Sequence, residues 1–156
     1  MLKSENTYSF LSDINLEEAK SILLKNTLIK TNLFYQSTAK QFIGNFIENK
    51  FSLIGTFSPI SIGCVLNGDF VQKEKLEINI TTTLHKGFSL LYKIWLIVLS
   101  LVFVVFSIVN FNIESVLILL IGLLFGAIFF KLFLNVIYVI ARNSALNNLR
   151  KLLKIE

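Results

Sequence analysis

The chain has 156 residues, 54% of them hydrophobic, and a mean hydropathy of +0.68. Soluble domains are about 45–50% apolar. The excess of apolar residues lies almost wholly after Phe88. The composition therefore excludes two soluble domains and indicates one soluble domain followed by membrane segments. The formal net charge is +5, of which residues 1–87 contribute +1 and residues 88–156 contribute +4. The excess of basic residues therefore flanks the apolar segments, as in membrane proteins. The basic patch that dominates nucleic-acid binding is missing from the N-terminal domain.

The polar part of the chain opens with a predicted strand and helix. Residues 1–6 lack the apolar stretch of a signal peptide, and residues 7–12 favour a short strand. Asn15 followed three residues later by Glu18 is the pattern of a helix capping box. Apolar residues at helical spacing follow, so we expect a helix that ends near residues 26–27.

Strand-forming residues dominate the next stretch, beginning with Leu33 and its two neighbours. The apolar runs 41–47 and 51–57 flank a short polar turn, which predicts a β-hairpin. Gly44 and Gly55 lie inside these runs and indicate either bulges or the close approach of another backbone.

After Pro59 a further strand is predicted over residues 60–66, and Asn67-Gly68-Asp69 is typical of a tight turn. Residues 76–85 alternate between apolar and polar, as in an antiparallel strand with one solvated face. Residues 1–87 are therefore predicted to form an α+β domain, with one helix on a mostly antiparallel sheet of about five or six strands.

An α-helical transmembrane hairpin is predicted over residues 88–141, with spans at 94–112 and 115–135. A span of about nineteen apolar residues at 1.5 Å per residue crosses a hydrocarbon core of about 30 Å. Neither span has the polar stripe of a soluble helix. Because the connection between the spans is only a few residues long, they must be antiparallel.

Charges at the span ends predict the orientation. Lys86 and Lys93 precede the first span and Arg142 follows the second, whereas the connection carries only Glu114. The positive-inside rule therefore places both termini in the cytoplasm and the short connection outside. Trp95 falls where an interfacial aromatic belt is expected, so these basic residues and Trp95 are candidate membrane-interface residues.

Two features of the second span have alternative interpretations. Lys131 lies about four residues, or roughly 6 Å of helix, from the cytoplasmic boundary, where its side chain can extend to the interface or can serve a pathway or a lipid headgroup. Gly122 and Gly126 form a GxxxG pattern that allows close helix packing, either against the first span or in a homodimer.

Residues 142–156 are predicted to form a basic amphipathic tail. An amphipathic helix with basic residues can lie at the cytoplasmic lipid surface. The same apolar stripe can instead pack back on the N-terminal domain. The sequence leaves both arrangements open.

Groups for catalysis or metal binding are scarce. Cys64 is the single cysteine, which excludes an intrachain disulfide, and it lies among apolar residues like a small core residue. The single histidine, His85, is predicted to be an interfacial side chain. A zinc site needs three or four Cys and His ligands, and phosphate-binding glycine motifs are missing. We therefore predict that the chain has no catalytic, cofactor or metal site and that it is not an enzyme.

The chain resembles a group of small bacterial membrane proteins without an assigned activity. The resemblance rests on the helix opening at residues 16–19, on Phe42-Ile43-Gly44 and Asn49-Lys50-Phe51, on Ser58-Pro59 with Gly63, and on a strand ending Leu84-His85 before a tryptophan-bearing membrane hairpin. It implies the same architecture and a bacterial inner membrane.

The expected function is that of a membrane-anchored binding or accessory protein. Its cytoplasmic domain would contact a protein partner or the lipid surface, and the chain could also form a homodimer. One alternative is a small oligomeric channel or transporter subunit, although the spans hold few polar residues. A second alternative is an enzyme acting on a membrane-proximal substrate.

Overall fold

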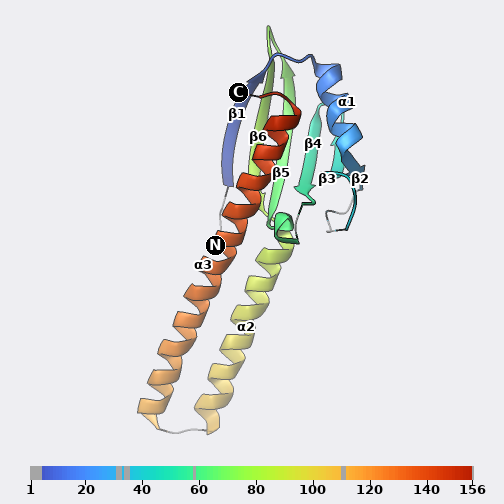
Figure 1. The fold of residues 1–156 in the computed structure, drawn as a ribbon. Coiled ribbons are helices and arrows are strands. Elements are labelled where there is room, and N and C mark those ends of the chain that lie inside the picture. Colours follow the sequence, from blue (N-terminus) through green and yellow to red (C-terminus); the bar gives the residue numbers. More distant parts are fainter. Residues whose placement is uncertain (1–4, 31–32, 34–35, 58, 110–111, 156) are drawn as a thin grey trace. The chain divides into compact units, whose positions relative to one another are not determined.

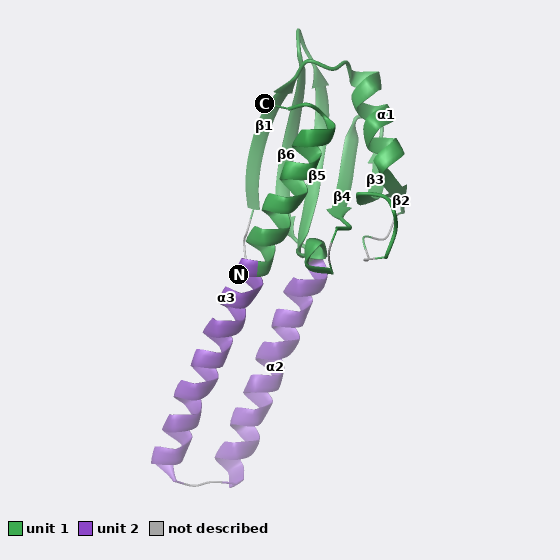
Figure 2. Cartoon of the chain, in the orientation of Figure 1, with its two compact units in different colours: residues 1, 3–85, 137–156 green, residues 2, 86–136 purple. Residues whose placement is uncertain are grey.

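A computed structural model describes residues 5–30, 33, 36–57, 59–109 and 112–155. The chain divides into two compact units (Figure 2). The first unit combines residues 3–85 with residues 137–156, and the second comprises residues 86–136. The last part of the chain therefore belongs to the same unit as the N-terminal domain.

The first unit is built on a six-stranded sheet with the order β1-β6-β5-β4-β3-β2 (Figure 1). The strands are β1 Glu5–Ser12, β2 Thr27–Ile29, β3 Phe42–Ile47, β4 Lys50–Gly55, β5 Cys64–Gln72 and β6 Leu76–Leu84. All neighbouring strands are antiparallel except β2 and β3, which are parallel. The predicted α+β fold with a mostly antiparallel sheet is confirmed.

Helix α1, Leu16–Asn26, begins as its capping pattern predicts. The Asn15 side chain accepts a hydrogen bond of 2.8 Å from the backbone N–H of Glu18, which satisfies one of the unpaired donors of the first turn. Ala19 and Leu23 are fully buried against the sheet. Because β1 and β2 lie at opposite edges, the segment that contains α1 passes from one edge of the sheet to the other.

The predicted hairpin is formed by β3 and β4, which pair without a break from Phe42 opposite Gly55 to Ile47 opposite Lys50. Gly44 marks a close approach of backbones, because a Cβ atom there would lie 2.0 Å from the carbonyl oxygen of Ser52. The predicted strand at residues 33–35 falls in part on residues 34–35, which lie outside the described residues.

Two local predictions after Pro59 are wrong. Pro59–Gly63 forms a short 3-10 helix, η1, so the strand begins only at Cys64. Asn67, Gly68 and Asp69 lie within β5 and pair with β4 on one side and β6 on the other. The turn that joins β5 to β6 falls instead at residues 73–75.

Gly68 explains why a turn pattern sits inside a strand. Its φ angle is not positive, so the glycine does not serve a turn. A Cβ atom at this position would lie 2.3 Å from Cζ of Phe51. The glycine therefore makes room for the Phe51 ring, which is 3% exposed in the core. This contact joins residues distant in sequence, which a local pattern does not reveal.

The main core lies on one face of the sheet, beneath α1 and the last turns of helix α3, Ile113–Leu152 (Figure 1). The strands contribute alternate side chains to it, such as Leu76, Ile78 and Ile80 of β6. On the opposite face a smaller cluster of Ile43, Ile54 and Val65 covers only one end of the sheet. The sheet is thus covered on one face and largely open on the other.

The last part of α3 is a structural element of the sheet unit. Its buried residues belong to the main core, together with two residues that follow the helix: Tyr138, Ala141, Ala145, Leu146, Leu149, Leu153 and Ile155. Of the two arrangements that the sequence leaves open for residues 142–156, the structure shows packing on the N-terminal domain.

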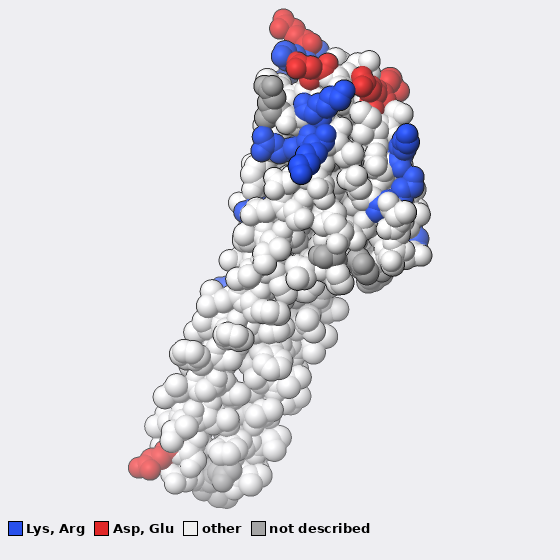
Figure 3. Space-filling model, viewed as in Figure 1, with Lys and Arg blue, Asp and Glu red and all other residues white. Residues whose placement is uncertain are grey.

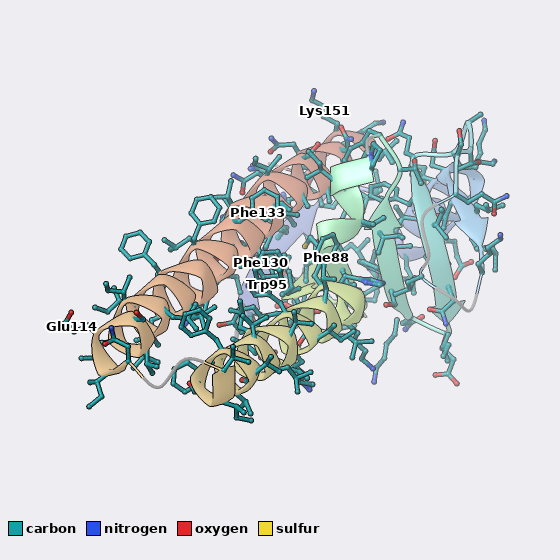
Figure 4. The ribbon with its side chains drawn as sticks, turned by 90° about the horizontal axis from the view of Figure 1, so that it is seen from below. Phe88, Trp95, Glu114, Phe130, Phe133 and Lys151 are labelled. Atoms are coloured by element: carbon teal, nitrogen blue, oxygen red, sulfur yellow. The ribbon has the colours of Figure 1, made fainter. Side chains whose placement is uncertain are left out.

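The second unit is an antiparallel pair formed by α2, Lys86–Val109, and the part of α3 up to residue 136 (Figure 2). Both helices are long and apolar enough to cross a membrane, and neither is buried along its most apolar stretch. Between the two helices the rings of Trp95 and Phe130 lie 5.3 Å apart, centroid to centroid (Figure 4).

Candidate interaction surfaces

The predicted membrane-interface residues of the second unit all lie on its surface. Lys86 is the first residue of α2, and Lys93 follows two turns later; both are exposed. Lys131 is exposed on α3. Trp95 is 37% exposed and packs one side of its ring on Phe130. Their exposure is compatible with contact to lipid headgroups, which stays a prediction.

The two glycines of the GxxxG pattern face open space. A Cβ atom at Gly122 or Gly126 would meet nothing within 4 Å among the described residues beyond its own helix turn. An apolar cleft of about 280 Å³ between the two helices is lined by side chains such as Leu99, Phe103 and Leu123 and by neither glycine. The glycines are therefore not used in packing α2 against α3, and homodimerisation through them stays a prediction.

Arg142, the fifth predicted interface residue, belongs to the sheet unit. Its guanidinium carbon lies 5.6 Å from the centroid of the Tyr138 ring, within the range of a cation–π contact. Its Nε and Nη2 donate to Oδ1 of Asn143 at 3.2 and 3.1 Å. Arg142 thus has contacts within this unit that its sequence position did not indicate.

A buried polar network joins α3 to the sheet, and sequence reasoning missed it. Tyr138 is 2% exposed. Its hydroxyl lies 2.8 Å from Oγ1 of Thr82, donates to the Thr82 carbonyl at 3.2 Å, and accepts from Nδ2 of Asn6 at 3.0 Å. Satisfied networks of this kind specify one packing arrangement. Its only sequence signal is Thr82 on the apolar side of an alternating strand.

Cys64 is a fully buried core residue, as predicted. Burial raises the pKa of its thiol from 9.0 to about 12, against smaller opposing effects of the Arg142 charge and the Thr83 backbone N–H. A thiol that stays protonated and covered is a poor nucleophile. The arrangement supports a packing role for Cys64.

This pKa predicts how stability depends on pH. Between pH 9.0 and about 12 the folded protein keeps the thiol proton that the unfolded chain has lost. Protonated Cys64 therefore contributes its whole share of the free energy of unfolding below pH 9.0, and this contribution decreases as the pH rises toward about 12. Denaturant unfolding of the wild type and Cys64→Ala should therefore show a wild-type advantage that shrinks at alkaline pH. A thiol reagent should modify the native protein only as fast as it opens. Rapid native labelling would contradict the assignment.

The open face of the sheet presents a row of small polar side chains across four strands. Asn45, Ser52, Asn67 and Thr81 are consecutive cross-strand partners. The Ser52 hydroxyl donates to Oδ1 of Asn67 at 2.7 Å. With Lys50 and Asp69, which face each other in the next row, they border a shallow hollow of about 440 Å³. The surface offers hydroxyl and amide groups with little net charge.

The described residues hold no group of three or more His, Cys, Asp and Glu placed to bind a metal ion. Nε2 of His85 lies 2.8 Å from the carbonyl oxygen of Leu33, so the histidine links the end of β6 to the loop before β3.

No protein-family model matches the chain, and no curated protein or solved structure is significantly similar to it. The resemblance to small bacterial membrane proteins stays a prediction.

Proposed function

We propose that this chain is a membrane-anchored interaction protein of a bacterial inner membrane. The two apolar helices hold it in the bilayer, and the sheet unit offers its uncovered face to a protein partner in the cytoplasm. The strongest support is that two separate chain segments form the first unit. Residues before α2 and residues after the apolar part of α3 share one hydrophobic core.

This shared core bears on the topology independently of charge. Segments that pack in one core lie on the same side of a membrane, and the chain between them contains two apolar helices. An even number of crossings satisfies both conditions. The basic residues at the outer helix ends then favour the cytoplasmic side.

The orientation predicts an accessibility pattern. Asn112 is exposed between α2 and α3, and Asn147 is exposed on the last turns of α3. In a Cys64→Ala background, Asn112→Cys should react with a membrane-impermeant maleimide in intact cells, whereas Asn147→Cys should react only after lysis. The reverse pattern would invert the topology, and labelling of both in intact cells would refute the anchored arrangement.

Partner binding can be tested on the open face. Asn67 lies at the centre of the polar row, so Asn67→Arg should hinder a partner seated there without disturbing the core. Native mass analysis of the protein purified in mild detergent would compare this variant with Ser21→Arg, which adds the same side chain at an exposed position on α1. A stoichiometric partner lost only from Asn67→Arg supports the proposal, and an unaffected complex argues against this face.

A further inference from the structure

The sheet has two edges of very different character. β2 is only three residues long, and short edge strands are one way in which proteins prevent unwanted pairing. β1 has eight residues, all paired with β6 in unbroken register, so it contains no bulge. It also contains no proline or lysine, the other common protective features. β1 therefore presents a long, regular row of backbone groups on its outer side.

The chain itself shows that this edge accepts a neighbouring strand. Ser12 pairs with Leu76 of β6 on one side and forms an antiparallel bridge with Ile155 on the other. The Ser12 hydroxyl also donates to the carbonyl oxygen of Leu153 at 2.8 Å. Among the described residues, this pairing covers the edge only at Ser12, so residues 5–11 are left without a neighbouring strand.

Charge is distributed unequally along the open part of the edge. Glu5 stands at one end of β1. The other end borders a hollow of about 370 Å³ lined by Ser9, Phe10, Leu11, Asp13, Lys75 and Lys154. A second hollow of about 340 Å³ shares Lys154 and adds Arg150 and Lys151. Together the linings hold four basic side chains and one carboxylate, a net charge of +3.

Three of these four basic residues, Arg150, Lys151 and Lys154, lie where α3 ends, and basic side chains gather there on the surface (Figure 3). The guanidinium carbon of Arg150 lies 5.4 Å from the centroid of the Phe10 ring, which holds one cation directly over β1. Asp13 is already paired with Lys75 at 2.7 Å. Glu77, which accepts a hydrogen bond of 3.1 Å from Ser9, is paired with Lys73. The positive potential at this end of the edge therefore comes mainly from Arg150, Lys151 and Lys154.

The two sides of the edge also differ in polarity. Tyr8 and Phe10 stack on the core side, with ring centroids 6.1 Å apart and planes 5° apart. Thr7 and Ser9 are exposed on the open face. A strand lying beside β1 would therefore meet an aromatic surface on one side and hydroxyl groups on the other, which suits alternating apolar and polar residues.

We propose that the free edge of β1 binds an extended segment of a partner protein, which adds as an antiparallel seventh strand with its acidic residues beside Leu11. Backbone hydrogen bonds along residues 5–11 supply affinity, as in other cases of strand addition. Charge sets the end of β1 beside which the acidic residues lie, because they are attracted to Lys154 and its neighbours and repelled by Glu5. The antiparallel direction follows the bridge that Ile155 already forms with Ser12. The inference rests on the proposed function in requiring this edge to face a soluble partner.

The test uses the full chain in detergent micelles and two synthetic peptides. The first has two glutamates at its N-terminal end followed by alternating valine and threonine; the second has lysines in place of the glutamates. Fluorescence anisotropy should show binding of the acidic peptide alone. Hydrogen exchange should show new protection within residues 5–12, because the outward amides of β1 become bonded.

A matched pair of variants separates local from general charge effects. The double variant Lys151→Glu, Lys154→Glu should bind the acidic peptide about tenfold or more weakly than the wild type does. Lys25→Glu with Lys30→Glu changes the net charge equally, at exposed positions on α1 and directly after β2, and should have little effect. Equal binding of both peptides, protection outside β1, or a dimer that forms without peptide would overturn the inference.

Maleimide labelling distinguishes failure of the inference about the β1 edge from failure of the proposed function. If Asn112→Cys labels in intact cells but the acidic peptide does not bind, only the role of the edge is refuted. If the peptide binds but the labelling pattern is reversed, the edge site stands and the cytoplasmic anchoring is refuted.

Discussion

Replacing Leu149 with aspartate is expected to unfold the sheet unit. Leu149 is completely buried in the main core, between the end of α3 and the sheet. Truncating such a leucine to alanine costs about 2–5 kcal/mol, and an unpaired buried carboxylate adds a further desolvation penalty. Because domains are stable by only about 5–15 kcal/mol, this single change should remove most or all of the folded population.

Limited proteolysis of the full chain in detergent provides the measurement, since an unfolded sheet unit is cut while helices covered by detergent resist. Asn147→Asp is the matched control, because it adds the same carboxylate two residues earlier at an exposed position. Leu149→Asp should be digested rapidly and Asn147→Asp as slowly as the wild type. Equal resistance of the two variants would show that the end of α3 does not belong to the core.

The consequence reaches the proposed function. α3 runs without interruption from Ile113 to Leu152, so one helix supplies both an apolar segment and part of the sheet core. A defect at Leu149 should therefore abolish partner binding while the maleimide pattern of Asn112→Cys persists. Loss of both together would mean that insertion itself depends on the folded sheet.

Gly44→Ala is expected to destabilise the sheet unit by about 3 kcal/mol or more. A Cβ atom at this position would lie 2.0 Å from the carbonyl oxygen of Ser52 and 3.0 Å from Cα of Leu53. Both neighbours are backbone atoms of β4, so no rotamer change relieves the clash. The strands β3 and β4 must move apart, which weakens the hydrogen bonds between them.

Gly122→Ala provides a control with the same chemistry and the opposite environment. The added methyl group meets nothing within 4 Å among the described residues beyond its own helix turn. Denaturant unfolding of the sheet unit, followed by circular dichroism in micelles, should show a large decrease in the free energy of unfolding for Gly44→Ala and no decrease for Gly122→Ala. A native-like stability of Gly44→Ala would contradict the β3–β4 register. A change of oligomeric state in Gly122→Ala would support homodimerisation through the GxxxG pattern.

The sequence alone determined the features that depend on neighbouring residues. The Asn15 cap, the β3–β4 hairpin and the alternation along β6 were all predicted, because capping, turn formation and side-chain alternation act within a few residues. The two long apolar helices were evident for the same reason, since crossing a membrane requires a continuous apolar run.

Only the tertiary structure decided the features that depend on distant partners. Asn67-Gly68-Asp69 has the composition of a turn, yet it lies within a strand, because the Phe51 ring fills the space beside Gly68. Residues 142–156 satisfy both a lipid surface and a protein core by their amphipathic pattern. Their place was decided by Tyr138, which bonds to Thr82 and Asn6, and by Ile155, which pairs with Ser12. A local pattern shows that a helix has an apolar stripe, but the surface that covers it is determined by contacts between residues far apart in the chain.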